Sequence, residues 1–157
     1  MIYTSRYSNP ELRKGNYFAV RVSLGTPKWE LGYRLDGEMK DLMPFGLLNK
    51  YDRYEDFKLE YFSRLGRIGV KRIQNQLDGF AWYGRDIVLL CYEDIRKGPE
   101  NWCHRTAFAE WWKLNTGIEL QELTDPTPSP VKAVISPSKE FSEAKNIQPQ
   151  IEQLSLF

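Results

Sequence analysis

The sequence predicts a three-layer, Rossmann-like α/β domain with a mainly parallel sheet, followed by a disordered C-terminal tail. Strand-like and helix-like segments alternate from Ile2 to Leu123, which is the pattern of α/β proteins. Residues 87–90 form a continuous apolar run without polar alternation, as in a strand that is buried on both faces of a parallel sheet. From Thr124 onward, proline, serine, threonine and charged residues dominate, and too few apolar residues remain to form a core.

The first half of the chain contains two predicted strands and one irregular segment. Residues 1–5 form a short first strand that ends before a turn, and residues 17–24 form a second strand rich in aromatic and β-branched residues. In residues 31–50, glycines and a proline interrupt every periodicity, so a loop or lid is expected there.

Two helices and a last strand complete the expected elements around the central apolar run. The first helix covers residues 52–64, with Asp52 as its N-cap. The second covers residues 68–77, where apolar residues recur at a spacing of three and four, and Gly79 is expected to end it. Residues 118–123 alternate between apolar and polar, which predicts a strand at the edge of the sheet.

The candidate catalytic residues follow the central apolar run. A helical pattern begins at Cys103, His104 and Arg105 and ends at Gly117. In open α/β sheets, ligands bind at the carboxyl ends of the strands, where helix N-termini present free amide groups. We therefore expect a set of reactive side chains to converge at one rim of the sheet. These are Cys91, Glu93, Cys103, His104 and Arg105.

Each of these residues has a chemical and a structural interpretation. A helix N-terminus and neighbouring cations would lower the pKa of Cys103, whereas apolar surroundings would raise the pKa of Cys91. His104 is the single histidine of the chain, so any imidazole acid or base must be this residue, and Arg105 is expected to depress its pKa. In the structural interpretation, both thiols and His104 are core residues and Arg105 pairs with Glu93 or Asp94.

Four residues at predicted strand ends are candidates for substrate binding. Arg6 and Tyr7 follow the first strand, and Lys28 and Trp29 follow the second. Arg6, Lys28 and Arg105 would hold an anion, while Tyr7 or Trp29 would stack on a ring. The alternative for Lys28 and Trp29 is that the lysine stem packs over the edge of the core.

Composition and motifs exclude several classes of protein. The chain has 22 basic and 21 acidic residues and a net charge of +1, so no global basic field indicates nucleic-acid binding. It lacks a signal-peptide pattern and an apolar run of about 18 residues, which favours a cytoplasmic protein with free thiols and no membrane partner. Phosphate-loop, dinucleotide-binding and nucleophile-elbow motifs are absent.

No cofactor and no metal site is expected from the spacing of the ligand-type residues. Cys91, Cys103 and His104 could supply three zinc ligands, but they do not occur in a C-x-x-C or H-x-x-x-H arrangement.

Two separated motifs resemble a known family. The pattern LLCYE at residues 89–93, followed by a loop and by CHR opening a tryptophan-containing helix, is similar to the domain-of-unknown-function 488 family. The stretch VSLGTPKW at residues 22–29 resembles phage-like members of that family. The resemblance implies the family's α/β fold over roughly residues 1–123, but no particular reaction.

The last five residues resemble a docking motif. QLSLF at residues 153–157 is similar to the pentapeptide by which bacterial replication and repair proteins bind the DNA polymerase sliding clamp. The resemblance implies that Gln153 fills a small polar pocket, that Leu154 makes a lesser contact, and that Leu156 and Phe157 enter a hydrophobic cleft. Residues 124–152 would then be a proline-rich linker.

The sequence therefore leaves three functions open. The first is a replication- or repair-linked bacterial or phage protein that docks on the sliding clamp and whose Cys/His/Arg site acts on an anionic, nucleotide-like or nucleic-acid substrate. The second is a non-catalytic protein that competes for the clamp. The third is a thiol-dependent small-molecule enzyme unrelated to DNA.

Overall fold

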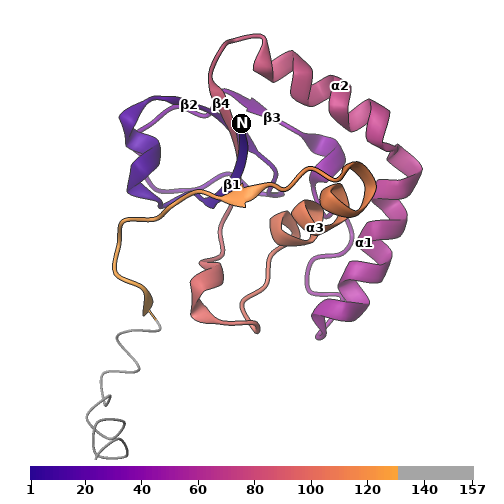
Figure 1. The fold of residues 1–157 in the computed structure, drawn as a ribbon. Coiled ribbons are helices and arrows are strands. Elements are labelled where there is room, and N and C mark those ends of the chain that lie inside the picture. The colour runs from indigo at the N-terminus through magenta and orange to yellow at the C-terminus, as the bar shows by residue number, and fades with distance from the viewer. Residues whose placement is uncertain (131–157) are drawn as a thin grey trace, which may run out of the picture.

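The computed structural model describes residues 1–130 and shows the predicted α/β fold with a parallel sheet (Figure 1). The sheet has the strand order β3-β2-β4-β1-β5, and every neighbouring pair is parallel. Its strands are β1 (Ile2–Arg6), β2 (Tyr17–Arg21), β3 (Gly37–Glu38), β4 (Asp86–Cys91) and β5 (Gln121–Glu122). Most of the predicted linker and the QLSLF motif lie outside the described residues.

Strand β4 is the centre of the sheet because it lies between β2 and β1. Ile87 and Leu89 pack on one face of the sheet, and Val88 and Leu90 pack on the other. All of them are buried, which explains why the run lacks polar alternation. In the register with β1, Cys91 lies opposite Arg6, so the carboxyl ends of the two strands meet at one edge.

The three α-helices cover one face of the sheet (Figure 1). They are α1 (Tyr54–Ile68), α2 (Val70–Ala81) and α3 (His104–Thr116). Their apolar sides pack against Phe18, Val20 and Leu89 of the sheet. The opposite face is covered by the 3-10 helix η1 (Pro10–Lys14) and by the loop of residues 31–35, so the third layer is built from these elements.

Helix ends differ from the sequence prediction in α1 and α2. The predicted N-cap Asp52 is wrong, because the chain becomes helical after Arg53, which makes no side-chain capping hydrogen bond. The predicted end at Gly79 is also wrong, since α2 continues through this residue to Ala81. Phe80, one residue further on, stacks on Phe18 with 5.2 Å between ring centroids, and this contact extends the apolar face of α2.

Two other elements are shorter or more regular than expected. Strand β2 ends at Arg21, whose guanidinium donates hydrogen bonds to the carbonyl oxygens of Ser23 and Leu24 and holds the chain in a turn. The irregular segment of residues 31–50 contains β3 and the 3-10 helix η2 (Lys40–Leu42). Helix α3 has the predicted bounds, and Gly117 ends it in the left-handed region with φ of 75°.

Candidate functional site

The structure brings Cys91, Cys103 and His104 together, and we call these three residues the Cys–His cluster. Cys91 is the last residue of β4, Cys103 is the N-cap of α3, and His104 is the first residue of α3. Nδ1 of His104 lies 3.6 Å from Sγ of Cys91 and 3.8 Å from Sγ of Cys103. One ligand atom from each residue lies within 4.8 Å of the others, and all three side chains are buried. Sequence spacing is no obstacle to this cluster, because a strand end and a helix start share one edge.

The imidazole of His104 is held in one orientation. Its Nε2 lies 2.7 Å from the carbonyl oxygen of Val22, immediately after β2. Because a carbonyl only accepts, Nε2 carries a proton, and Nδ1 faces the two sulfurs. The ring of Tyr61 packs edge-on against the imidazole, and the Tyr61 hydroxyl donates to the carbonyl oxygen of Leu42.

The two thiols have opposite electrostatic environments. Contact with Cys103, together with burial, raises the pKa of Cys91. Burial also opposes ionisation of Cys103, but its contacts with Cys91 and His104 lower the pKa of Cys103 well below its ordinary value. This is the direction that the sequence predicts for the thiol at the helix N-terminus.

The prediction that Arg105 depresses the pKa of His104 is wrong. Burial favours the neutral imidazole, but the adjacent Cys103 sulfur, the carbonyl oxygen of Val22 and the nearby Glu93 together raise the pKa of His104. The guanidinium of Arg105 is paired with Glu122 instead, at 2.8 Å.

Arg105 forms a buried ion pair that links α3 to the sheet edge. Its side chain is 1% exposed, and it donates to the carboxylate of Glu122 in β5 and to the backbone carbonyl oxygen of Glu93. The hydroxyl of Thr4 donates to the same Glu122 carboxylate at 2.7 Å. The structural interpretation predicts that Arg105 pairs with Glu93 or Asp94. Arg105 does bind Glu93, through the backbone carbonyl oxygen, but its ion pair is with Glu122. Within residues 1–130, its Nη1 atom has no hydrogen-bond partner.

Glu93 lies beside the Cys–His cluster. The thiol of Cys91 donates to Oε2 of Glu93 at 3.1 Å. Burial, followed by the nearby Cys103, raises the pKa of Glu93. A carboxyl with a raised pKa beside thiols and an imidazole is typical of a site that transfers protons.

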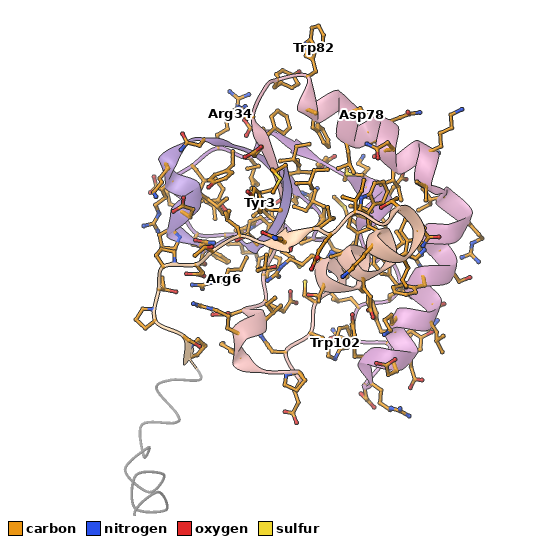
Figure 2. All side chains as sticks on the ribbon, viewed as in Figure 1. Tyr3, Arg6, Arg34, Asp78, Trp82 and Trp102 are labelled. Atoms are coloured by element: carbon orange, nitrogen blue, oxygen red, sulfur yellow. The ribbon has the colours of Figure 1, made fainter. Side chains whose placement is uncertain are left out.

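A cavity of about 170 Å³ opens next to these groups, and we call it the aromatic cavity. Glu93, Cys103 and His104 form one part of its wall. The remaining wall consists of three aromatic residues and the segment that follows η2: Tyr51, Phe57, Trp102, Pro44, Leu47, Leu48 and Asn49. Trp102 lies in the loop between β4 and α3, next to α1 (Figure 2), and its ring centroid is 4.8 Å from that of Phe57.

The aromatic wall of the cavity was not predicted from the sequence. Trp102 directly precedes Cys103, and this adjacency is the one sequence signal that could have identified it. Tyr51 and Phe57 come from a distant part of the chain and reach the cavity only through the packing of α1 against α3.

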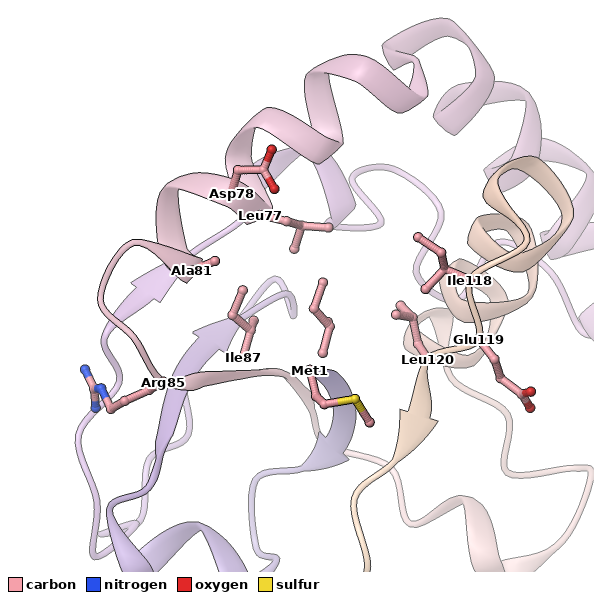
Figure 3. A pocket seen from close by; sticks show the side chains of 10 residues that line it. Met1, Leu77, Asp78, Ala81, Arg85, Ile87, Ile118, Glu119 and Leu120 are labelled. Atoms are coloured by element: carbon pink, nitrogen blue, oxygen red, sulfur yellow. The ribbon is translucent and has the colours of Figure 1, made fainter.

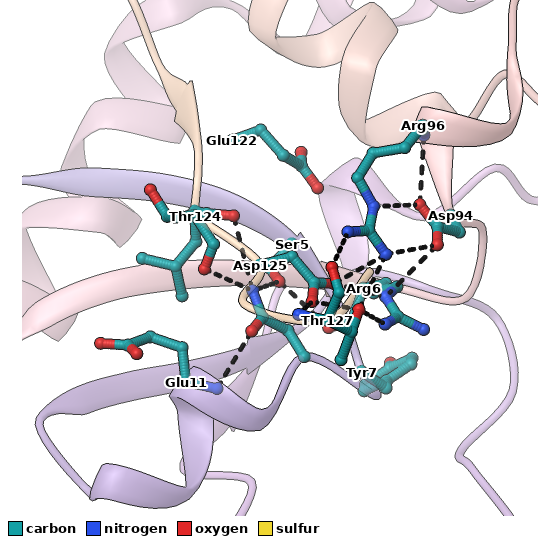
Figure 4. A network of polar contacts seen from close by, with 12 residues as sticks. Ser5, Arg6, Tyr7, Glu11, Asp94, Arg96, Glu122, Thr124, Asp125 and Thr127 are labelled. Atoms are coloured by element: carbon teal, nitrogen blue, oxygen red, sulfur yellow. Dashed lines mark hydrogen bonds and ion pairs between the residues drawn. The ribbon is translucent and has the colours of Figure 1, made fainter. Parts of the chain in front are cut away.

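The four predicted substrate-binding residues do not line the aromatic cavity. Arg6 donates to Asp125 at 2.7 Å and belongs to a polar network with Asp94 and Arg96 (Figure 4). Tyr7 is buried at the opposite face of the sheet and shares a hydrogen bond with Ser23. Lys28 is exposed, and Trp29 is 48% exposed and packs edge-on against Tyr92.

A second cavity, of about 290 Å³, lies at the amino ends of the strands (Figure 3). Met1, Leu77 and Ile118 contribute to its mainly apolar wall. Among the described residues that line this second cavity there is no cysteine and no histidine. The candidate catalytic residues therefore lie at the other edge of the sheet, at the carboxyl ends of the strands.

Comparisons with protein-family models, curated proteins and solved structures find no match to this chain. Within residues 1–130, no helix combines the length and the apolar character needed to cross a membrane.

Proposed function

We propose that the chain contains an enzyme domain whose reactive groups are Glu93 and the Cys–His cluster, and whose substrate presents a flat, uncharged ring, such as the base of a nucleotide-like molecule. The observation that supports this is the lining of the aromatic cavity, to which Glu93, Cys103 and His104 contribute together with three aromatic residues. Aromatic side chains bind rings by stacking, while carboxyl, thiol and imidazole groups transfer protons.

The size and charge of the cavity narrow the substrate class. Its volume of about 170 Å³ is below the roughly 300–1,000 Å³ of sites for drug-sized ligands, so it fits a ring system and not a whole nucleotide. Among the described residues that line it, none is lysine or arginine. The ring of a nucleotide-like substrate would therefore enter the cavity, and any phosphate group would stay outside.

The experiment is a conversion assay with the full-length protein. Free bases, nucleosides, nucleotides and short single-stranded DNA are incubated with it, and products are detected by mass spectrometry. Glu93→Gln is expected to lose at least about tenfold in turnover while the melting temperature changes little, because a general acid or base contributes about 10²–10⁴-fold. Glu100→Gln, at an exposed carboxyl on the same loop, is the control and should keep wild-type turnover.

Equal turnover by Glu93→Gln and the wild type would remove Glu93 from the mechanism. If no member of the panel is either bound or converted, the proposed substrate class is wrong.

We further propose that the chain docks on a bacterial DNA polymerase sliding clamp through Gln153, Leu154, Leu156 and Phe157. The observation in favour is the QLSLF sequence at the end of a proline-rich segment. Two buried large apolar side chains contribute roughly 1.5–3 kcal/mol each, a large share of the roughly 8 kcal/mol of a micromolar contact, and the contacts of Gln153 and Leu154 would supply the rest. The protein would then be a cytoplasmic replication- or repair-linked factor of a bacterium or phage, and its free thiols suit that reducing compartment.

The docking test is a titration of a bacterial sliding clamp by calorimetry. Leu156→Ala plus Phe157→Ala should abolish micromolar binding, whereas Val134→Ala plus Ile135→Ala, which removes two apolar residues outside the motif, should leave it unchanged. Equal binding by wild type and the first variant, or no binding by either, would end this proposal. Clamp binding by a protein without turnover would favour the non-catalytic competitor.

A further inference from the structure

We propose that the Cys–His cluster binds one zinc ion through Sγ of Cys91, Sγ of Cys103 and Nδ1 of His104, and that the fourth coordination position is open toward the aromatic cavity. Binding of the metal rests on the geometry of the cluster alone. A role for the metal in turnover rests on the function proposed above.

The distances within the cluster match a tetrahedral zinc site. Zinc bonds are about 2.3 Å to sulfur and about 2.0–2.1 Å to nitrogen, so tetrahedral angles place sulfur and nitrogen ligands about 3.6 Å apart. Nδ1 of His104 lies 3.6 Å from Sγ of Cys91 and 3.8 Å from Sγ of Cys103. The three ligand atoms all lie within 4.8 Å of one another, so small side-chain movements suffice to close the site around an ion.

His104 is held by a hydrogen bond of the kind that usually orients a metal-binding imidazole. A ligating imidazole usually donates its other N–H to a carbonyl or carboxylate, which fixes the ring and the tautomer. Nε2 of His104 lies 2.7 Å from the carbonyl oxygen of Val22, so Nδ1 is directed at the two sulfurs. The ligands also lie on regular elements, at the end of β4 and the start of α3, which position side chains more accurately than loops do.

The donor set selects the metal. Thiolates together with an imidazole favour zinc and other soft or borderline ions over magnesium and calcium, which prefer oxygen. The site is buried, and two thiolates carry a charge of about −2 that a divalent ion neutralises. A metal would therefore remove the cost of burying ionised thiols.

The open position follows from the number of protein ligands. Structural zinc sites have four protein ligands, whereas catalytic sites have three and a water. Within residues 1–130, the group of ligand atoms that lie within 4.8 Å of one another contains Cys91, Cys103 and His104 and no fourth residue. Cys103 and His104 also line the aromatic cavity, so the water would face it. Glu93, on the same wall, would be placed to accept a proton from such a water.

The test measures the metal without any substrate. Full-length protein purified from zinc-supplemented medium should contain one zinc per chain by elemental analysis. After removal of zinc with a chelator, titration with Co²⁺ should give one equivalent of a tetrahedral cobalt spectrum with charge-transfer bands from two thiolates, and zinc should displace it. The proposed site would be wrong if the purified protein held no zinc and also gave no thiolate-to-cobalt bands. It would also be wrong if Cys91 and Cys103 formed a disulfide in place of binding a metal.

Ligand variants provide a second measurement. Cys103→Ser and His104→Gln should weaken zinc binding at least about tenfold, and each is compared only if its amide spectrum shows a folded domain. Glu93→Gln and Glu100→Gln should each keep one zinc. Loss of zinc in Glu93→Gln would overturn the open fourth position, because it would make Glu93 a ligand.

The failure of this proposal and that of the proposed function can be told apart. One zinc per chain without conversion of any substrate would support the metal site and count against the function. Full turnover by protein freed of zinc would support the function and overturn the role of the metal in it.

Discussion

Among single residues, Arg105 makes the ion pair whose removal should be most costly. Its side chain is 1% exposed and binds the Glu122 carboxylate and the Glu93 carbonyl oxygen. Arg105→Met leaves Glu122 without its main partner, so we expect the free energy of unfolding to fall by about 2–4 kcal/mol. This loss is somewhat smaller than for a fully buried ion pair, because Glu122 is partly exposed to solvent. Urea denaturation measures this change.

Arg72→Met is the matched control for Arg105. Arg72 also pairs with a carboxylate, Asp41 at 2.7 Å, but its side chain is 67% exposed. The expected loss is below about 1 kcal/mol, because solvent screens an exposed pair. Similar losses for both variants would show that the Arg105 pair gains nothing from burial.

Asp94 should make the stability of the domain dependent on pH in the acid range. Hydrogen bonds from Arg96 lower the pKa of Asp94 from 3.8 to about 2. A carboxyl with a depressed pKa stabilises the fold fully above its unfolded pKa and loses this contribution as pH falls toward its folded pKa. We expect wild type to exceed Asp94→Asn by about 1–2 kcal/mol at about pH 6 and by almost nothing at about pH 2. Chemical denaturation of both proteins at each pH measures the difference, and a constant gap would contradict this assignment.

For single residues, the sequence predicts which side chains lie at the same edge of the sheet, but not which of them form ion pairs or hydrogen bonds with one another. Cys91, Cys103 and His104 could be placed on one rim because strand ends and helix starts share an edge in α/β folds. The partner of Arg105 could not be predicted, since Glu122 reaches it only because β5 lies beside β1. The same holds for Arg6, whose partner Asp125 lies beyond the last predicted strand.

Among the secondary-structure elements, helices α2 and α3 each have a glycine at or near the C-terminal end. Replacing these two glycines by alanine should change the stability of the domain in opposite directions. Gly79 lies inside α2, and a Cβ there would meet open space, so Gly79→Ala should stabilise the domain by about 0.5–1 kcal/mol. Gly117 ends α3 with φ of 75°, where a Cβ is strained, so Gly117→Ala should cost about 1 kcal/mol. Thermal unfolding measures both, and destabilisation by Gly79→Ala would place the helix end at Gly79 after all.

Helices α2 and α3 show why the end of a helix cannot always be predicted from the local sequence. Gly117 adopts the left-handed conformation that ends a helix, with φ of 75°, so the local signal determines the end of α3. Gly79 looks the same in sequence, but Phe80 packs on Phe18 of β2 and keeps the chain helical. Tertiary contacts of this kind are not visible in a window of a few residues.

For the whole molecule, the parallel sheet was predictable and the strand order was not. The apolar run of β4 requires cover on both faces, which indicates a parallel sheet with two covering layers. The position of β4 between β1 and β2 depends on contacts between residues more than 60 positions apart, such as Tyr17 with Asp86 and Ile2 with Ile87. No local pattern encodes such pairings.

The C-terminal boundary of the domain also depends on distant contacts. The sequence places the boundary after Leu123, but Asp125 and Thr127 accept hydrogen bonds from Arg6 and Arg96 at the carboxyl ends of β1 and β4 (Figure 4). The Asp125 side chain is 8% exposed. We therefore expect the folded unit to extend at least to Thr127.

Truncation tests this boundary. A chain ending at residue 130 should unfold with nearly the free energy of the full-length protein. A chain ending at residue 123 should lose about 1–3 kcal/mol, because the two arginines keep Asp94 but lose Asp125 and the Thr127 hydroxyl as partners. Asp125→Asn in the longer fragment should reproduce part of this loss, since the amide keeps one acceptor oxygen but not the charge. If the two fragments are equally stable, the network in Figure 4 contributes nothing to the fold and the boundary belongs at Leu123.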